Sequence, residues 1–343
     1  MTRINTIAEM AWSHDGSESK AIKILKAAKN SGADYLGIHV TNMESYMSIY
    51  YNNSPGKVSK GKENLDIFKY LENINLSEKN WININKIAKK TKIKLCVMPN
   101  DIKSLEFVIK KIKPDMYALS AASFTELEMI NKIAKQKKKT VLRIGGATIQ
   151  EIQKVIKIFK KNNNNQFILL HGIQVYPTSS SDINLNQLIF LKNKFKCKIG
   201  IADHIDGSDE FAVVIPSLAL PYGITYVEKH ITLNREEKSE DFESALDPKN
   251  FKKMVNLIGL SFKSLGKFNF SNLSKAEKKY RQISRKRTVA KNIIRKGQKI
   301  TKNNTTFKRS DIGLEPMQLG KYLGKKVKKT IFADYPIVER NLV

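Results

Sequence analysis

The chain has 343 residues, of which 41% are hydrophobic and only two, Cys96 and Cys197, are cysteines. At roughly 150 residues per domain, this length predicts about two domains with enough apolar residues for a full core. Two cysteines exclude a disulfide scaffold and a four-cysteine zinc module. We find no apolar run of the ~18 residues that a membrane span needs, and no signal-peptide core at the start, so we expect a cytoplasmic protein without a membrane partner.

The charge is strongly basic, with 61 Lys and Arg residues against 32 Asp and Glu residues and a net charge of +29. A basic surface can indicate nucleic-acid binding. Here lysine greatly outnumbers arginine and is spread over predicted helix faces and loops, whereas base recognition favours clustered arginine with its bidentate fork. We therefore interpret the charge as compositional bias and expect no nucleic-acid partner.

Eight short β-rich segments alternate with amphipathic helical stretches over residues 1–267. Helices are predicted, among others, over 19–31, 124–136 and 149–160. The expected strands are 4–8, 35–39, 94–97, 116–119, 140–144, 167–171, 198–201 and 225–228. Eight β/α repeats over about 260 residues predict an α/β fold of the TIM type, a closed parallel (β/α)8 barrel. A doubly wound open sheet is the alternative, but no G-x-G-x-x-G follows the first strand.

Residues 42–80 form a connection that is unusually long for a compact domain. Long loops of this kind are commonly functional or disordered. On a barrel this segment would lie at the catalytic end, where Tyr50, Tyr51 and the lysine-rich residues 57–62 could form a lid over the site or a decorated surface.

The sequence pattern changes after residue 267. Residues 268–286 are polar and basic, as in a linker, and residues 287–343 read as short strands with turns around Gly297 and Gly313. We therefore predict a small, mostly-β second domain at 287–343. A module of this size is marginally stable alone and should dock on something.

All five histidines fall in the barrel half of the chain. Strand ends converge on one mouth of a barrel, and several histidines there favour a metal or acid/base site, whereas a single one would more often be a packing residue. Glu9 and Asp241 are candidate carboxylates beside them. The histidines are His14 in the first loop, His39, His171 and His230 at the ends of strands two, six and eight, and His204 just past strand seven.

Several motifs, in the right order along nearly the whole chain, resemble the sialic acid (N-acetylneuraminate) synthase family. The opening IAEMAWSHDGS is similar to the family pattern I-A-E-I-G-x-N-H-x-G, and the likeness continues through LLHGIQVYP, ADHIDG and VEKHITLNREEKSEDFESALDP. The segment VAKNIIRKGQKITKNNTTFKRSDIGLEP is similar to the family's C-terminal antifreeze-like (SAF) domain.

The resemblance implies an enzyme that condenses phosphoenolpyruvate with an N-acylated amino sugar to give a nonulosonic acid. It implies a divalent metal, Mn²⁺ or Mg²⁺, held by two histidines that match His204 and His230 and polarising the sugar aldehyde. The first-strand glutamate of the family matches Glu9. On the sugar side the family residues match Tyr176 and Asp241. The SAF-domain Lys-Arg pair matches Lys308 and Arg309, and in the family this arginine reaches the partner subunit's site, so a domain-swapped homodimer is implied.

The phosphoenolpyruvate half of the family pattern is absent. Gly37 and Ala118 stand where the family has lysines, and a dianionic phosphate needs charge-assisted donors. The other departures are His39, Met98, Ala121, Arg143, Gln174 and Ala202. We expect Arg143 to point into the barrel mouth and to bind a substrate anion, with a protein acid such as Glu9 as the other possible partner, because burying a guanidinium unpaired is costly.

Three interpretations remain open. The first is a nonulosonic acid synthase, a carbon–carbon bond-forming transferase in which Arg143, His39 and loop lysines supply new anion donors. The second is a metal-dependent sugar-processing relative that no longer uses phosphoenolpyruvate. The third is a non-catalytic sugar-binding homologue, against which the retained metal ligands argue. The expected catalytic residues are Glu9, His204 and His230, and the two histidines are also the expected metal ligands. The expected substrate-binding residues are Tyr176, Asp241, Arg309, Arg143, Gln174 and His39.

Overall fold

The computed structural model describes residues 3–51, 58–266 and 272–343. The chain divides into two compact units, Met1–Gly266 and Lys267–Val343. Each unit has its own hydrophobic core, and the two are described separately below.

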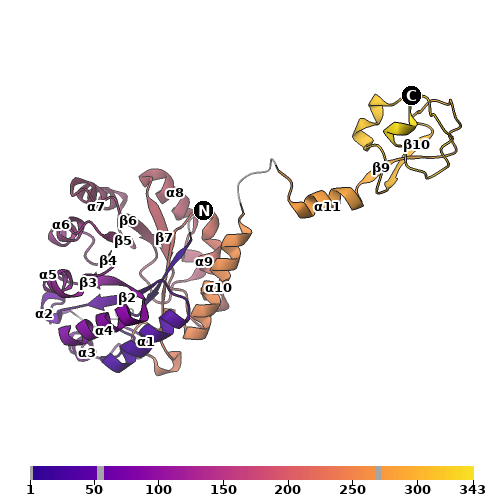
Figure 1. Ribbon diagram of the computed structural model, residues 1–343. Helices are drawn as coiled ribbons and strands as arrows, with labels where there is room; N and C mark the ends of the chain where they lie inside the picture. Colours follow the sequence, from indigo (N-terminus) through magenta and orange to yellow (C-terminus); the bar gives the residue numbers. More distant parts are fainter. Residues whose placement is uncertain (1–2, 52–57, 267–271) are drawn as a thin grey trace. The chain divides into compact units, whose positions relative to one another are not determined.

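The first unit is a closed barrel of eight parallel strands that pair in sequence order, with β8 returning to pair with β1 (Figure 1). The strands are β1 Asn5–Glu9, β2 Tyr35–Val40, β3 Lys94–Pro99, β4 Met116–Leu119, β5 Lys139–Arg143, β6 Phe167–His171, β7 Lys198–Ala202 and β8 Tyr226–His230. The predicted (β/α)8 barrel is confirmed, and every expected strand is present within two residues of its predicted bounds. Closure of the sheet excludes the open doubly wound alternative.

Helices follow the strands and surround the barrel in Figure 1. Several start at a side chain that caps the first turn, such as Ser17 accepting from the Lys20 amide and Thr148 in a reciprocal box with Glu151. The helices are α1 Glu18–Asn30, α4 Glu78–Thr91, α5 Ile102–Phe107, α6 Leu127–Lys135, α7 Ile149–Lys161, α8 Asn186–Phe195, α9 Ile215–Leu218 and α10 Pro248–Ser264. Short 3₁₀ turns lie at Ser180–Asp182, Glu210–Val213, Leu220–Tyr222, Arg235–Glu237 and Phe242–Ser244, and a π turn at Val108–Ile112.

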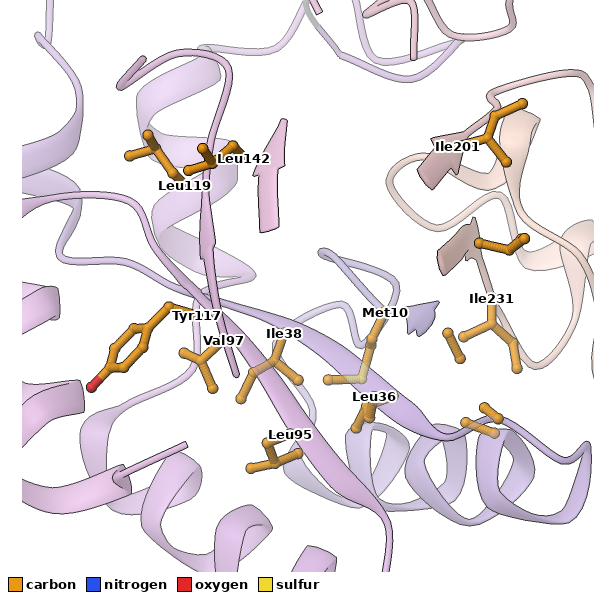
Figure 2. Close-up of a cluster of buried hydrophobic side chains, with 14 of the residues drawn as sticks. Met10, Leu36, Ile38, Leu95, Val97, Tyr117, Leu119, Leu142, Ile201 and Ile231 are labelled. Atoms are coloured by element: carbon orange, nitrogen blue, oxygen red, sulfur yellow. The ribbon is translucent and has the colours of Figure 1, made fainter. Parts of the chain in front are cut away.

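Strand residues alternate between two hydrophobic clusters, as the period of two requires. One set packs beneath the helices, and Figure 2 shows members of it, including Leu36, Ile38, Leu95, Val97 and Leu142. The other set fills the barrel interior with Ile7, Tyr35, Cys96, Met98, Met116, Ala118, Val141, Ile168, Leu170, Ala202 and Tyr226. Inward-facing positions recur every second residue along each strand. Near the carboxyl ends of the strands, at the mouth of the barrel, these positions are Glu9, Arg143, Glu228 and His230.

The long connection after β2 is partly helical rather than one loop. It contains α2 Met43–Tyr46 and α3 Ile67–Asn73, and their apolar residues Met43, Ile67 and Leu71 join a small separate core. Tyr50 and Tyr51 are exposed. Residues 52–57, part of the expected lid, lie outside the described residues, whereas residues 58–63 pack against the turn after β8.

The second unit begins with α11 Lys275–Ser284 and continues with the antiparallel pair β9 Lys286–Ala290 and β10 Thr305–Arg309. Two 3₁₀ turns follow, at Pro316–Lys321 and Glu339–Asn341. Within the expected linker 268–286, residues 275–284 form a helix, because Ser274 and Glu277 form a capping box that starts it there. Among the described residues, no helix is long and apolar enough to cross a bilayer.

Candidate active site

Arg143 is the centre of a buried charged cluster at the barrel mouth. From the end of β5 its Nη2 donates to Oε2 of Glu9 on β1 and, at 2.9 Å, to Oε2 of Glu228 on β8. Its Nη1 lies 3.5 Å from Nε2 of His39 and 3.2 Å from the sulfur of Met98. One guanidinium thus spans the barrel from β5 to β1, β2, β3 and β8.

The cluster shifts the protonation of its members. Burial lowers the pKa of Arg143, but the Glu228 and Glu9 carboxylates outweigh it and raise that pKa. Burial raises the pKa of Glu9, but Arg143, His39 and the hydrogen bond from the Ala11 amide together have the larger effect. The pKa of Glu9 is therefore lowered from its usual value. Burial raises the pKa of Glu228 to about 7 against the opposing charge of Arg143. Burial also lowers the pKa of His39 to about 4, so near neutral pH this imidazole carries no charge.

These contacts correct the role expected for Arg143. Its side chain is 10% exposed and paired with two protein carboxylates, whose side chains are 1% and 2% exposed. A guanidinium neutralised in this way has no net charge to offer a substrate phosphate or carboxylate. Arg143 is therefore partnered by two protein acids. One is Glu9, the other partner that we expected as possible, and the second is Glu228.

His204 and His230 face one another beside this cluster, with ring centroids 5.4 Å apart. Nδ1 of His204 donates to the Ile173 carbonyl at 2.7 Å, which leaves the Nε2 lone pair free for a metal. Nδ1 of His230 is buried without a hydrogen-bond partner and lies 3.9 Å from Oδ2 of Asp241. Burial lowers the pKa of both, to about 3 for His204, so both imidazoles are neutral, as metal ligands must be.

The two histidines therefore fit a divalent metal as two of its ligands. Over the described parts of the chain, no group of three or more His, Cys, Asp or Glu side chains is close enough together to hold an ion. A metal at His204 and His230 would complete its coordination with water or substrate oxygens, which suits an ion that keeps open positions.

A fully buried ion pair supports the strand ends that carry these histidines. Nζ of Lys229 donates to Oδ1 of Asp203 at 2.6 Å and to the Ile205 carbonyl at 3.2 Å, and both charged side chains are 0% exposed. Asp203 and Lys229 immediately precede His204 and His230. The pair thus joins β8 to the residue that follows β7, at the positions next to the two histidines in sequence.

The residues expected on the sugar side gather around the same histidines. The Tyr176 ring lies 4.3 Å from the His204 ring and 5.8 Å from the His230 ring, measured between centroids. Its hydroxyl donates to Oε1 of Gln174 at 2.9 Å. Burial raises the pKa of Asp241 well above its usual range, and Glu240 adds to that shift. An aromatic face, an amide, a carboxyl group and two imidazoles are thus available to a polar ligand.

Two of the five histidines are not part of this site, which corrects the expectation that all converge on the mouth. His171 lies on the outward-facing side of β6, and its Nε2 bonds the Ile183 carbonyl at 2.8 Å. His14 packs edge-on to Trp81, with ring centroids 5.6 Å apart, and its Nδ1 accepts from the Gly16 amide. Both are packing histidines.

In the second unit, Arg309 is exposed on β10 and donates to Oγ of Ser284 at 3.3 Å. Its neighbour Lys308 is paired with Asp334. The expected role of Arg309 in a partner's site stays a prediction.

Most of the departures from the family pattern lie in the barrel interior or at its mouth. Met98 and His39 contact Arg143, and a Cβ added to Gly37 would lie 2.4 Å from Oε2 of Glu9. Ala118 and Ala202 belong to the same interior cluster as Met98. A side chain at 37 would displace the carboxylate that Arg143 binds, so Gly37 belongs to the same charged cluster.

Sequence reasoning missed two acids and one lysine of the site. Glu228 lies two residues before His230 on one strand, so the period of two already placed it on the same face. Asp203 and Lys229 are charged residues next to apolar strand positions. This pattern indicates that each belongs to a buried pair, but it does not show which residue is the partner.

Comparison with known proteins identifies the family. Residues 24–269 match the model of the NeuB family, and residues 288–343 match that of the SAF domain. The chain is 29% identical to a pseudaminic acid synthase of Campylobacter jejuni over 97% of this chain and 95% of the relative. It is 28% identical to an N,N'-diacetyllegionaminic acid synthase of the same species over 99% and 100%.

Among solved structures, the fold is similar to the N-acetylneuraminic acid (sialic acid) synthetase of Leptospira borgpetersenii. The TM-score is 0.71 at 25% identity, over 82% of this chain and 92% of that chain. With the barrel, the paired histidines and the C-terminal module in the order that the motifs predict, the chain belongs to the NeuB family.

Proposed function

We propose that the protein is a nonulosonic acid synthase that condenses phosphoenolpyruvate with an N-acylated amino sugar. The observation that carries the proposal is the facing pair His204 and His230, with Tyr176 and Asp241 around it, in a chain related over nearly its full length to pseudaminic and legionaminic acid synthases. In this reaction C3 of phosphoenolpyruvate bonds to the sugar aldehyde carbon, water adds to C2, and phosphate leaves.

Each residue has a role that its geometry allows. A divalent metal on His204 and His230 would polarise the aldehyde oxygen. Tyr176 and Gln174 orient the sugar against the imidazoles, and the carboxyl group of Asp241 hydrogen-bonds a sugar hydroxyl. Glu228 has a pKa of about 7, so it is partly protonated near neutral pH and can exchange a proton there.

A second function is favoured by one observation, the neutralised Arg143. Together with Gly37 and Ala118 at the family's lysine positions, it leaves a phosphate dianion without a strong donor at the inner end of the mouth. On that ground the alternative is a metal-dependent reaction on an amino sugar or a nonulosonic acid that does not use phosphoenolpyruvate.

A phosphate-release assay separates the two functions. The full chain is incubated with Mn²⁺, phosphoenolpyruvate and a panel of N-acylhexosamines, and sugar-dependent phosphate is measured. Release that is abolished by His204→Ala supports the synthase. No release with any sugar, while the sugars still raise the melting temperature in the presence of Mn²⁺, favours the alternative.

The control for this assay is His171→Ala, because His171 is a histidine of the same barrel that lies outside the site. The synthase proposal expects this variant to keep its activity. Equal loss in both histidine variants would mean that the assay reports folding, and it would remove the support for a metal at His204 and His230.

A further inference from the structure

Residues 58–63 of the connection after β2 pack against the turn at residues 239–244, which follows β8 and carries Asp241. The two segments are far apart in sequence, yet a set of buried hydrogen bonds joins them. Glu240 and Glu243, which are 4% and 7% exposed, receive most of these bonds. Buried carboxylates are costly unless hydrogen-bonded, so each segment depends on the other.

Ser59 is at the centre of this contact and is itself buried, at 5% exposure. Its backbone amide donates to Oε1 of Glu240 at 2.7 Å, and its hydroxyl donates to Oε2 of Glu243 at 2.9 Å. The same hydroxyl accepts from the backbone amide of Asp241 at 2.6 Å. One serine thus binds three residues of the turn, and one of them is Asp241.

Asp241 needs such support because its backbone has a φ of +64°, in the left-handed region that non-glycine residues rarely adopt. A residue in this conformation persists only when its surroundings determine it. The conformation matters to the site because it brings Oδ2 of Asp241 to 3.9 Å from Nδ1 of His230.

The other contacts hold the two glutamates rather than Asp241. The Lys60 amide donates to Glu243 at 2.5 Å, and the Tyr70 hydroxyl and Lys62 Nζ donate to Glu240 at 2.9 and 3.3 Å. These bonds do not involve the Ser59 hydroxyl, so we expect them to hold the segments together when it is removed. Replacing Ser59 should therefore loosen Asp241 without releasing the whole contact.

We propose that Ser59 is a positioning residue that fixes Asp241 for recognition of the sugar. This inference rests on the proposed function for the nature of the ligand, but the hydrogen bond itself does not. It also gives the long connection after β2 a role, because the connection supplies the hydroxyl that accepts from the Asp241 amide.

The first test is independent of any reaction. Hydrogen exchange is measured by mass spectrometry on peptides covering residues 239–244 in the wild type, Ser59→Ala, Ser59→Thr and, as a control, Ser264→Ala on the exposed end of α10. We expect exchange in this turn to rise roughly tenfold in Ser59→Ala and to stay near wild type in Ser59→Thr, which keeps the hydroxyl. Unchanged exchange in Ser59→Ala would overturn the proposal.

The second test uses the phosphate-release assay. Ser59→Ala should raise KM for the N-acylhexosamine about five- to tenfold, while KM for phosphoenolpyruvate and kcat stay within about twofold. A fall in kcat with KM unchanged would contradict a positioning role. If the wild type releases no phosphate, the proposed function fails, and the exchange result still decides whether Ser59 holds Asp241. Glu243→Gln, which weakens the same hydroxyl bond, gives a second reading if Ser59→Ala does not fold.

Discussion

At the scale of single residues, the charged cluster at the mouth of this barrel is centred on one arginine. Arg143 draws together Glu9 and Glu228, and His39 and Met98 complete its surroundings. Burying three charged groups is stable only when each is paired, so the members constrain one another. Gly37 is part of the constraint, because the Glu9 carboxylate occupies the space where a side chain at 37 would begin.

Gly37→Ala tests that constraint. A Cβ at 2.4 Å from Glu9 Oε2 forces the carboxylate away from Arg143, and we expect a loss of about 1–3 kcal/mol in the free energy of unfolding by urea. The matched control is Gly259→Ala within α10, where a Cβ meets nothing within 4 Å and removal of a helical glycine should be neutral or stabilising. Equal effects at both positions would contradict this account of the cluster around Arg143.

His14 gives a prediction about pH. Burial lowers its pKa from 6.5 to about 3, so between these values the unfolded chain binds a proton that the folded chain does not. Stability contributed in this way is present above pH 6.5 and is lost as the pH falls, by about 2–3 kcal/mol at pH 4.5. Urea unfolding of His14→Phe across pH 7 to 4.5 should show a shallower decline than the wild type. Parallel declines would refute the linkage.

At the scale of elements, β7 and β8 depend on the pair Asp203 and Lys229. Removing one charge of a fully buried pair leaves the other uncompensated, so Asp203→Asn should cost about 3–5 kcal/mol in urea unfolding. The same variant should weaken Mn²⁺ binding, measured by calorimetry, because the pair joins the two backbone segments that carry His204 and His230. Glu106→Gln, in a solvent-exposed pair with Lys132, should leave the free energy of unfolding nearly unchanged.

A double variant distinguishes an unpaired charge from poor packing as the cause of the lost stability. Asp203→Leu combined with Lys229→Met replaces both charges by apolar groups, and we expect it to regain most of the lost stability. If the double variant is no better than Asp203→Asn, the cost comes from packing rather than from an unpaired charge.

At the scale of the whole molecule, the family resemblance predicts a homodimer in which Arg309 serves the partner's barrel. Complementation tests this with two inactive variants, His204→Ala and Arg309→Ala, mixed after dissociation. In a swapped dimer one site of each mixed pair has both residues, so random mixing should restore about a quarter of wild-type activity. Arg309 acting within its own chain would restore none, and a monomer by sedimentation would exclude the dimer.

The sequence alone determined the order of the strands, the closed barrel and the C-terminal module, because strand and helix periodicity are local and the family motifs run in order along the chain. It also brought His204, His230, Tyr176 and Asp241 to one site through those motifs. Local patterns did not show that residues 275–284 form a helix, since polar, basic composition is shared by linkers and exposed helices.

Only the tertiary structure decided which charges meet. Arg143 is 134 residues from Glu9 and 85 from Glu228, and Ser59 is 182 residues from Asp241. Pairs so distant in sequence are fixed by strand register and by the direction of each side chain, which also sends His171 outward while His230 points into the mouth. Periodicity says which face a residue occupies, but the partner across the barrel depends on closure of the sheet.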